Sequence, residues 1–373
     1  MIIFVALDIN ISVLQLFCLN LGVIRVLNAV GKYTQMRIKT QIQCFICTAC
    51  AILFTALPAM SQNKRSREVE NLVSENSLRR DVAFLSSGIC TGRAAGSAGA
   101  VETNFWIADQ FEKAGLKKVC SSWFEHFRAP GNVRCHNVIG MLEGSKYYHR
   151  DSYIIIGAHY DHLGELNGTL YPGADANGSG VASMIAIMRM FSYMRSKGIT
   201  FTSNILFVAF DAKELSLAGS EALWKDIKGE YLTDPTTGKR IKASQIRLVV
   251  NIDQVGSSLA PLSSGREDYL IMLGNNSIAK SHQSYAKEVN NTFGTGLELA
   301  YNYYGSDKFT EVFYKKVADQ KVFVANGKPA ILFTSGITYK TNKPSDTADT
   351  LNYPVLRRRV IFMFHWLEKF LQI

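Results

Sequence analysis

Hydrophobic positions along the chain follow two different periods after about residue 62. Nearly continuous apolar runs of five or six residues predict buried strands at 153–158, 205–210, 248–252, 269–273 and 330–334. Longer segments with an apolar residue every three or four positions predict helices at 66–86, 99–115, 180–196 and 354–371. Strands that are apolar on both faces need cover on both sides. The pattern therefore predicts an α/β three-layer sandwich, with a mostly parallel central sheet flanked by helices.

The first 61 residues are expected to lie outside this fold. From Met36 the chain reads Met-Arg-Ile-Lys, then an apolar run over 42–57, then the small residues before Gln62. This order is typical of a secretory signal, and a membrane anchor is the alternative. We expect translation to start at Met36, residues 36–61 to be removed, and residues 62–373 to form a single domain. That domain would be exported, to the periplasm or the cell exterior, and would have no stable membrane span.

Composition narrows the class of protein. With 47% hydrophobic and 19% charged residues, the chain is typical of a folded globular protein and not of a disordered one. The net charge is +10, but the longest basic run is Arg357 to Arg359, so no nucleic-acid partner is predicted. Only Cys90, Cys120 and Cys135 lie outside the leader. Cys120 and Cys135 would close a short loop, but three cysteines leave one unpaired and the disulfide is not favoured.

Polar side chains follow three of the predicted strands, at the edge of the sheet where active sites of such folds gather. A His-x-Asp pair or an acidic residue after one strand is weak evidence, because loop hydrogen bonds and helix caps use the same residues. Together, one imidazole and three carboxylates suit a dinuclear zinc site, because a carboxylate has two oxygens and can bridge two ions. The residues concerned are His159, Asp161, Asp175, Lys213, Glu214 and Asp253.

Six motifs occur in a fixed order along the chain. They are Gly92 to Ser97, Gly157 to His162, Gly173 to Gly180, Phe207 to Ser220, Asn251 to Asp253 and Lys343 to Thr347. In this order they resemble metallopeptidase family twenty-eight, the bacterial leucyl aminopeptidase type, from about residue 80 to the end. The resemblance implies a phosphorylase/hydrolase-like α/β sandwich, co-catalytic zinc and a peptide substrate.

The resemblance also implies roles for individual residues. His159 and Asp253 would hold the first zinc ion, Asp175 would bridge the two ions, and Glu214 would hold the second. Asp161 would orient His159, as carboxylates behind a metal-bound imidazole commonly do.

Two positions depart from the family pattern. Lys213 stands where the family has the glutamate that acts as general base, and it would replace that base only as a neutral amine. Asn342 stands where the family has the histidine that binds the second ion. An asparagine there would be at most a weak ligand. The carboxylates of Asp175, Glu214 and Asp253 with the Lys213 ammonium sum to −2, which one zinc neutralises. A second zinc would leave uncompensated buried charge, so one ion is favoured over two.

Three interpretations remain open. The first is an exported zinc exopeptidase, aminopeptidase-like, that hydrolyses N-terminal peptide bonds with impaired activity. The second is a non-catalytic binding ectodomain on a peptidase fold. The third is a one-metal enzyme similar to glutaminyl cyclases, which is disfavoured because that site also uses a histidine near Asn342. The sequence does not predict an oligomeric state.

Overall fold

A computed structural model describes residues 65–144, 151–262 and 264–371. The chain divides into two compact units, Met1–Arg67 and Glu68–Ile373, of which the second contains nearly all the described residues. The predicted leader of residues 1–61 lies outside the described residues.

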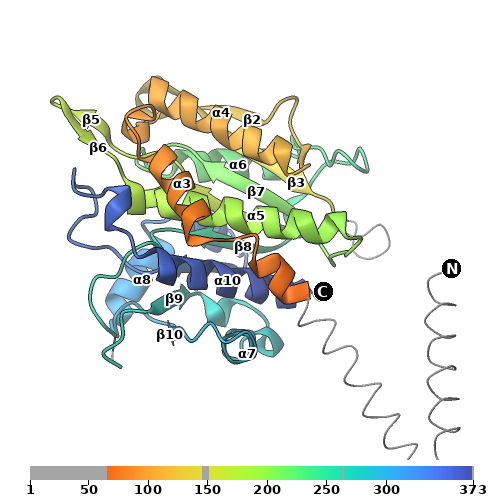
Figure 1. Cartoon of the computed structure of the whole chain (residues 1–373). Helices are drawn as coiled ribbons and strands as arrows, with labels where there is room; N and C mark the ends of the chain where they lie inside the picture. Colours follow the sequence, from red (N-terminus) through yellow and green to blue (C-terminus); the bar gives the residue numbers. More distant parts are fainter. Residues whose placement is uncertain (1–64, 145–150, 263, 372–373) are drawn as a thin grey trace, which may run out of the picture. The chain divides into compact units, whose positions relative to one another are not determined.

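One mixed sheet of nine strands runs through the described part of the second unit (Figure 1). Its strands are β1 (Lys117–Lys118), β2 (Phe124–Ala129), β3 (Val133–Leu142), β4 (Tyr153–His159), β7 (Asn204–Phe210), β8 (Ile246–Ile252), β9 (Tyr269–Leu273), β10 (Glu298–Ala300) and β11 (Ala330–Thr334). Two short strands, β5 (Gly164–Leu166) and β6 (Thr169–Tyr171), form a separate hairpin.

The centre of the sheet is parallel and its flanks are mixed. The strand order is β1-β3-β7-β4-β8-β11-β9-β10, and β2 pairs with β3. β7, β4, β8 and β11 are parallel neighbours, whereas β3 runs antiparallel to β7 and β9 antiparallel to β11. The predicted α/β class is confirmed. The parallel centre brings the carboxyl ends of four strands to one edge.

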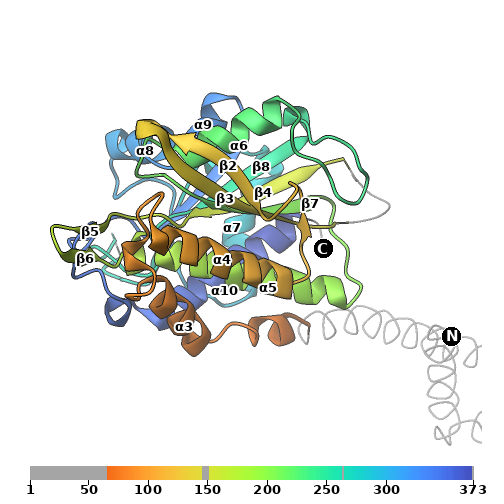
Figure 2. The same ribbon diagram turned by 90° about the horizontal axis from the view of Figure 1, so that it is seen from above.

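Helices cover both faces of the sheet (Figure 2). One face carries α3 (Glu75–Leu85), α4 (Ala98–Lys113), α5 (Gly180–Ser196) and α10 (Tyr353–Phe370), with α7 (Tyr285–Thr292) packed against α10. The other carries α6 (Ala218–Lys228), α8 (Asp307–Lys315) and α9 (Gln320–Ala325). No helix in the described ranges is both long and apolar enough to cross a membrane.

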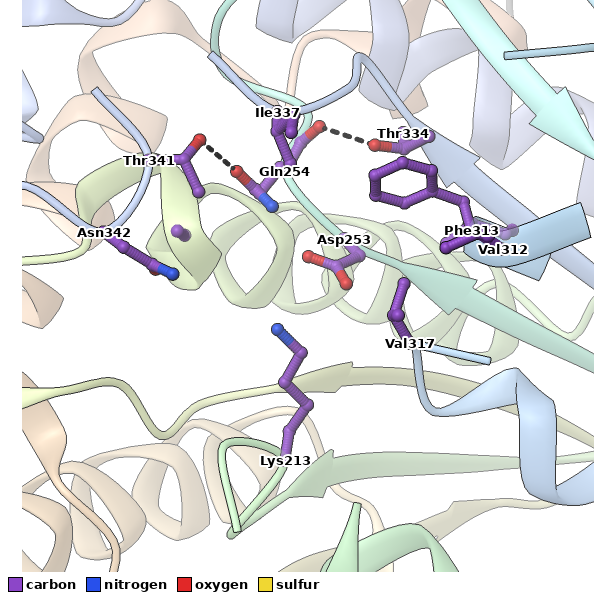
Figure 3. A pocket seen from close by; sticks show the side chains of 12 residues that line it. Lys213, Asp253, Gln254, Val312, Phe313, Val317, Thr334, Ile337, Thr341 and Asn342 are labelled. Atoms are coloured by element: carbon purple, nitrogen blue, oxygen red, sulfur yellow. Dashed lines mark hydrogen bonds between the residues drawn. The ribbon is translucent and has the colours of Figure 1, made fainter. Parts of the chain in front are cut away.

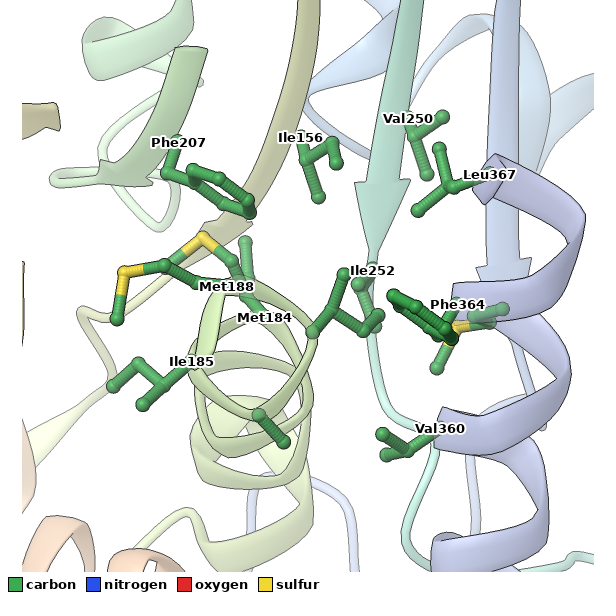
Figure 4. Packing of buried hydrophobic residues seen from close by; sticks show 14 of the residues in the cluster. Ile156, Met184, Ile185, Met188, Phe207, Val250, Ile252, Val360, Phe364 and Leu367 are labelled. Atoms are coloured by element: carbon green, nitrogen blue, oxygen red, sulfur yellow. The ribbon is translucent and has the colours of Figure 1, made fainter. Parts of the chain in front are cut away.

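The central strands are apolar throughout because each face packs against helices. In β4, Ile154 and Ile156 pack in the cluster with α5 and α10, while Ile155 packs in the opposite cluster with α6 and α9. Figure 4 shows the first of these clusters, in which Met184 and Phe364 meet the sheet from two helices. A polar residue at any of these positions would be buried without a partner, which explains the unbroken apolar runs.

The predicted strands and most of the predicted helices are confirmed within a residue or two. The predicted helix over 66–86 is wrong as one element, because residues 71–74 are not helical. Ser74 there starts α3 through a capping box with Ser77, at 3.0 Å for each of the two side chain to backbone bonds. The hairpin of β2 and β3 was not predicted, although Pro130 and Gly131 mark its turn. Cys90, Cys120 and Cys135 are all free thiols.

A buried histidine links the C-terminal helix to the start of the unit. His365 on α10 is 1% exposed, and its ring nitrogens lie 2.6 Å from Glu368 Oε2 and 2.9 Å from Glu70 Oε1. Its ring stacks on Phe293 with centroids 3.5 Å apart. Burial lowers the pKa of His365, but the hydrogen bonds to the two glutamates outweigh burial and raise it above its usual value.

This arrangement predicts a stability that falls at alkaline pH. A raised folded-state pKa means that the contribution of His365 is complete below the ordinary histidine value of about 6.5 and is lost as the pH rises through the higher folded value. We expect His365→Gln to lower the melting temperature more at about pH 6 than at about pH 9, measured by scanning fluorimetry. His282→Gln is the control, because burial lowers the pKa of His282 and reverses the sign. An equal loss at both pH values for His365→Gln would contradict the account.

Candidate functional site

The structure places the predicted site residues at the carboxyl edge of the parallel strands. His159 is the last residue of β4, and Asp253 directly follows β8. Lys213 and Glu214 lie in the loop after β7, and Asp175 lies in a π-helical turn, Ala174–Ser179, that leads into α5. Side chains from three strand ends and one helix start therefore meet at the edge where open α/β sheets bind ligands.

His159 lies between two carboxylates. Its Nε2 is 3.4 Å from Asp253 Oδ1, and its Nδ1 is 3.1 Å from the backbone oxygen of Asp161 and 3.4 Å from that residue's Oδ1. The ring is 1% exposed. Asp161 thus holds the Nδ1 side, which leaves Nε2 directed at Asp253. The role predicted for Asp161, to orient a metal-bound His159, stays a prediction.

Lys213 and Glu214 form an ion pair that Asp161 fixes in place. The Lys213 Nζ lies 2.9 Å from Glu214 Oε1. The backbone N–H groups of Lys213 and Glu214 donate to the two oxygens of Asp161, at 3.0 Å and 2.9 Å. Asp161 is fully buried just after β4, and these two hydrogen bonds tie the loop after β7 to the end of β4. Asp161 therefore contacts both His159 and the loop that carries the ion pair.

Asp175 is held by one of its two oxygens. Its Oδ1 accepts hydrogen bonds from the Gly256 N–H at 2.7 Å and from the Ser179 hydroxyl at 2.8 Å. Its Oδ2 is buried and makes no hydrogen bond within the described part of the chain. Burial raises the pKa of Asp175 above its usual value. The hydrogen bonds from Gly256 and Ser179 lower this pKa, but burial outweighs them. One oxygen is thus anchored and the other is free to accept a ligand.

The charged groups shift one another's pKa values. Burial and the Lys213 ammonium both lower the pKa of His159, but Asp253 and Asp161 outweigh them and raise it to about 10. Burial raises the pKa of Asp253, but His159 and Lys213 lower it to about 2. Burial lowers the pKa of Lys213, and Asp253 and Glu214 raise it above its usual value. In the absence of any added cation, His159 and Lys213 balance the neighbouring carboxylates.

A pocket of about 240 Å³ opens at this edge, and Asp253, Lys213 and Asn342 contribute to its wall. Figure 3 shows the Lys213 ammonium pointing into the pocket toward Asp253. Asn342 is exposed and has a positive φ of 60°. The remaining wall is mainly apolar, from Val312, Phe313, Val317, Leu332 and Ile337, with Ala176, Gln254, Thr334 and Thr341 completing it.

A complete metal cluster is not preformed. Among the residues that the structure describes, no group of three or more His, Cys, Asp and Glu side chains lies close enough together to hold an ion. His159 lies beside Asp253, but no third ligand is close enough to complete the set predicted for the first zinc ion. Glu214, predicted for the second ion, is paired with Lys213 instead.

Two observations still fit one zinc ion at the His159 side. Two ligands on a tetrahedral zinc, each bonded at about 2.0–2.1 Å, lie about 3.4 Å apart, which is the separation of His159 Nε2 and Asp253 Oδ1. Within the described residues, Asp253 Oδ1 and Asp175 Oδ2 are buried without a hydrogen bond, which an ion would explain. The second ion does not fit, because Glu214 is paired with Lys213 and an ammonium offers no lone pair.

Three further buried residues at the site lie within the sequence motifs, but no function was predicted for them. Arg93 and Asp346 are buried and bind the backbone around Asp175. Their positions inside two motifs were the available signal. His162 is buried, and neither of its ring nitrogens has a hydrogen-bond partner in the described ranges. Burial and Arg93 lower its pKa to about 2, so it stays neutral.

The α/β fold, with a histidine and carboxylates at the ends of its parallel strands, is similar to that of metallohydrolases. The model of Peptidase family M28 matches residues 137–366, which is more than half of the chain, so the chain belongs to this family. A probable zinc metalloprotease of Pyrenophora tritici-repentis (strain Pt-1C-BFP) is 25% identical, over 50% of this chain and 42% of the relative. Aminopeptidase YwaD of Bacillus subtilis (strain 168) is 31% identical, over 34% of this chain and 23% of the relative. The chain thus spans less than half the length of these two curated relatives.

Solved structures share the fold at low sequence identity. The LapA aminopeptidase of Legionella pneumophila superposes with a TM-score of 0.61 and 17% identity, over 83% of this chain and 75% of that one. The glutaminyl cyclase of Porphyromonas gingivalis superposes with a TM-score of 0.58 and 16% identity, over 81% of this chain and 99% of that one. The neighbours therefore include proteins named for two different reactions on one fold, and fold does not choose between them.

The geometry predicts which histidine matters for zinc. We expect His159→Ala and Asp253→Ala each to abolish tight zinc binding, because each removes one of the two donors that face each other. His162→Ala should retain it. Thermal shifts with and without zinc separate these cases, since a ligand that binds the folded state raises stability. Equal zinc-dependent stabilisation of the wild type and His159→Ala would refute the assignment.

Proposed function

We propose that this chain is an exported zinc-dependent exopeptidase, aminopeptidase-like, that holds one zinc ion and hydrolyses N-terminal peptide bonds slowly. The observation that carries the proposal is the facing pair of His159 Nε2 and Asp253 Oδ1, next to the free buried oxygen of Asp175. Membership of Peptidase family M28 supports the reaction class.

Each residue near the zinc would have a separate task. His159, Asp175 and Asp253 would hold the ion, which supplies Lewis-acid polarisation of the scissile carbonyl. With zinc at Nε2, the remaining ring proton of His159 would lie on Nδ1, where the oxygens of Asp161 would accept it.

Lys213 accounts for the slow reaction. Its ammonium donates to Glu214 and offers no lone pair to take a proton from water. A general base contributes about 10²–10⁴ in rate, so this chain should fall short of a two-zinc enzyme by a comparable factor.

The pocket favours an apolar first residue in the substrate. Val312, Phe313 and Ile337 line the space beside Asp253. An apolar side chain that enters this space would gain free energy by leaving water. A charged side chain would lose its hydration without a partner to replace it. We therefore propose leucine-like or aromatic N-terminal residues over charged ones.

A non-catalytic binding domain is the second candidate. The Lys213–Glu214 ion pair favours it, because an ammonium cannot act as a base and the pair occupies the Glu214 carboxylate. Release of a chromogenic amine from leucyl and aspartyl substrates by purified residues 62–373 distinguishes the two candidates. Release that depends on zinc and prefers the leucyl substrate supports the exopeptidase. No release by a zinc-loaded protein would favour the binding domain.

Restoring the two altered positions should convert the site. We expect the double variant Lys213→Glu/Asn342→His to bind a second zinc ion and to hydrolyse the leucyl substrate about 10²–10⁴ times faster. The single variant Lys225→Glu is the charge-matched control, since Lys225 lies on α6 and does not line the pocket. Metal analysis alongside the kinetics checks both parts. A double variant that still holds one zinc ion at wild-type activity would count against the proposal.

Export is the remaining part of the proposal, and its support is the signal-like sequence over residues 36–61, outside the described residues. We expect the protein recovered outside the cytoplasm to begin at Gln62. N-terminal sequencing measures this directly. A protein that retains residues 36–61 would instead be an anchored one.

A further inference from the structure

Two fully buried arginines stand close to the metal-binding loops, and the reaction proposed above gives neither of them a task. Arg93 and Arg359 are both 0% exposed. Neither forms an ion pair with any carboxylate of the described residues; their N–H groups donate mainly to backbone carbonyls. A buried charge is costly unless it is fully hydrogen-bonded, so a specific arrangement of carbonyls must hold each one.

Arg93 joins the end of β4 to the loop before Asp175. Its Nε donates to the carbonyl of Tyr160 at 2.7 Å, and its two terminal nitrogens donate to Pro172 at 2.7 Å and Gly173 at 2.8 Å. Tyr160 directly follows His159, and Gly173 comes two residues before Asp175. The planar guanidinium therefore sets the distance between the segments that carry two of the zinc ligands.

Asp346 holds the same loop from the other side. Its Oδ1 accepts from the Asp175 N–H at 2.8 Å, its Oδ2 from the Ala176 N–H at 3.0 Å, and its backbone oxygen from the Ala174 N–H at 3.1 Å. Three successive N–H groups thus bind one buried residue. This leaves the backbone of the turn around Asp175 little freedom.

Arg359 acts on the loop after β8. One of its terminal nitrogens donates to the carbonyls of Val255 and Ser257, at 2.7 Å and 2.9 Å. Between them lies Gly256, whose N–H donates to Asp175 Oδ1. A side chain at Gly256 would meet Leu351 at 2.5 Å and Asp175 Oδ1 at 2.9 Å, so only glycine fits between them. Arg359 thus fixes the donor that anchors one oxygen of Asp175.

From these contacts we infer that Arg93, Asp346 and Arg359 are positioning residues. They hold Asp175 with Oδ1 anchored and leave Oδ2, which has no hydrogen bond in the described part of the chain, available to the zinc ion of the proposed site. The inference rests on the proposed zinc site. It assigns a task to the Gly92 to Ser97 and Lys343 to Thr347 motifs, which supply no zinc ligand themselves.

The test is the isosteric variant Asp346→Asn in the purified zinc-free protein. An amide has one acceptor oxygen, so one of the two N–H groups of the turn would face a donor. We expect the zinc dissociation constant, measured by competition with a chromophoric chelator, to rise about 10–100-fold, as for other groups that orient metal ligands.

Asp234→Asn is the matched control. Asp234 is 0% exposed, and its Oδ1 also accepts two successive backbone N–H groups, from Thr236 and Thr237, at 2.7 Å and 2.9 Å. Its other oxygen accepts from Tyr153, at the opposite end of β4 from His159. This variant should lower the melting temperature of the zinc-free protein and leave the zinc dissociation constant unchanged.

Each outcome decides the inference. An unchanged zinc dissociation constant in Asp346→Asn, or equal weakening by Asp346→Asn and Asp234→Asn, would overturn it. If Asp346→Asn does not fold, Arg359→Lys replaces it with the same readout and the same expected weakening. A wild type that binds no zinc would overturn the proposed function together with this inference, whereas a zinc-binding wild type with an unaffected Asp346→Asn overturns the inference alone.

Discussion

Buried carboxylates at one sheet edge impose the constraint on which this site depends. Asp161, Asp175 and Asp253 are nearly inaccessible to water, and like charges in such a place repel strongly unless cations or N–H groups balance them. Backbone N–H groups satisfy Asp161, while His159 and Lys213 lie beside Asp253. Without these partners, ionised carboxylates buried at the strand ends would destabilise the fold.

The same balance limits what the site can do. The ammonium of Lys213 already neutralises Glu214, and the proposal of a single zinc ion rests on this ion pair. The cost is chemical, because a bound ammonium donates protons and cannot accept them. The fold is shared with aminopeptidases and a glutaminyl cyclase, so the fold by itself does not choose between their reactions.

The sequence predicted those features that depend on local pattern. Buried central strands need unbroken apolar runs, so β4 was predictable, and with it the place of His159 at the end of that strand. The interruption of the helix before α3 depends on the N-cap serine, Ser74, and the spacing of hydrophobic residues does not reveal such a cap. The clamp of Arg93 on Gly173 spans 80 residues of sequence, and the bond of Asp346 to Asp175 spans 171. Such pairings follow from the folded topology and leave no periodic signal in the chain.

Anomalous diffraction at the zinc absorption edge, from crystals of residues 62–373 grown with zinc, tests the central claim most directly. The account predicts one anomalous peak per chain, bonded to His159 and Asp253 with Asp175 as a further ligand, and the Lys213 ammonium still on Glu214. Two peaks per chain, with Glu214 released from Lys213 to bind the second, would contradict it.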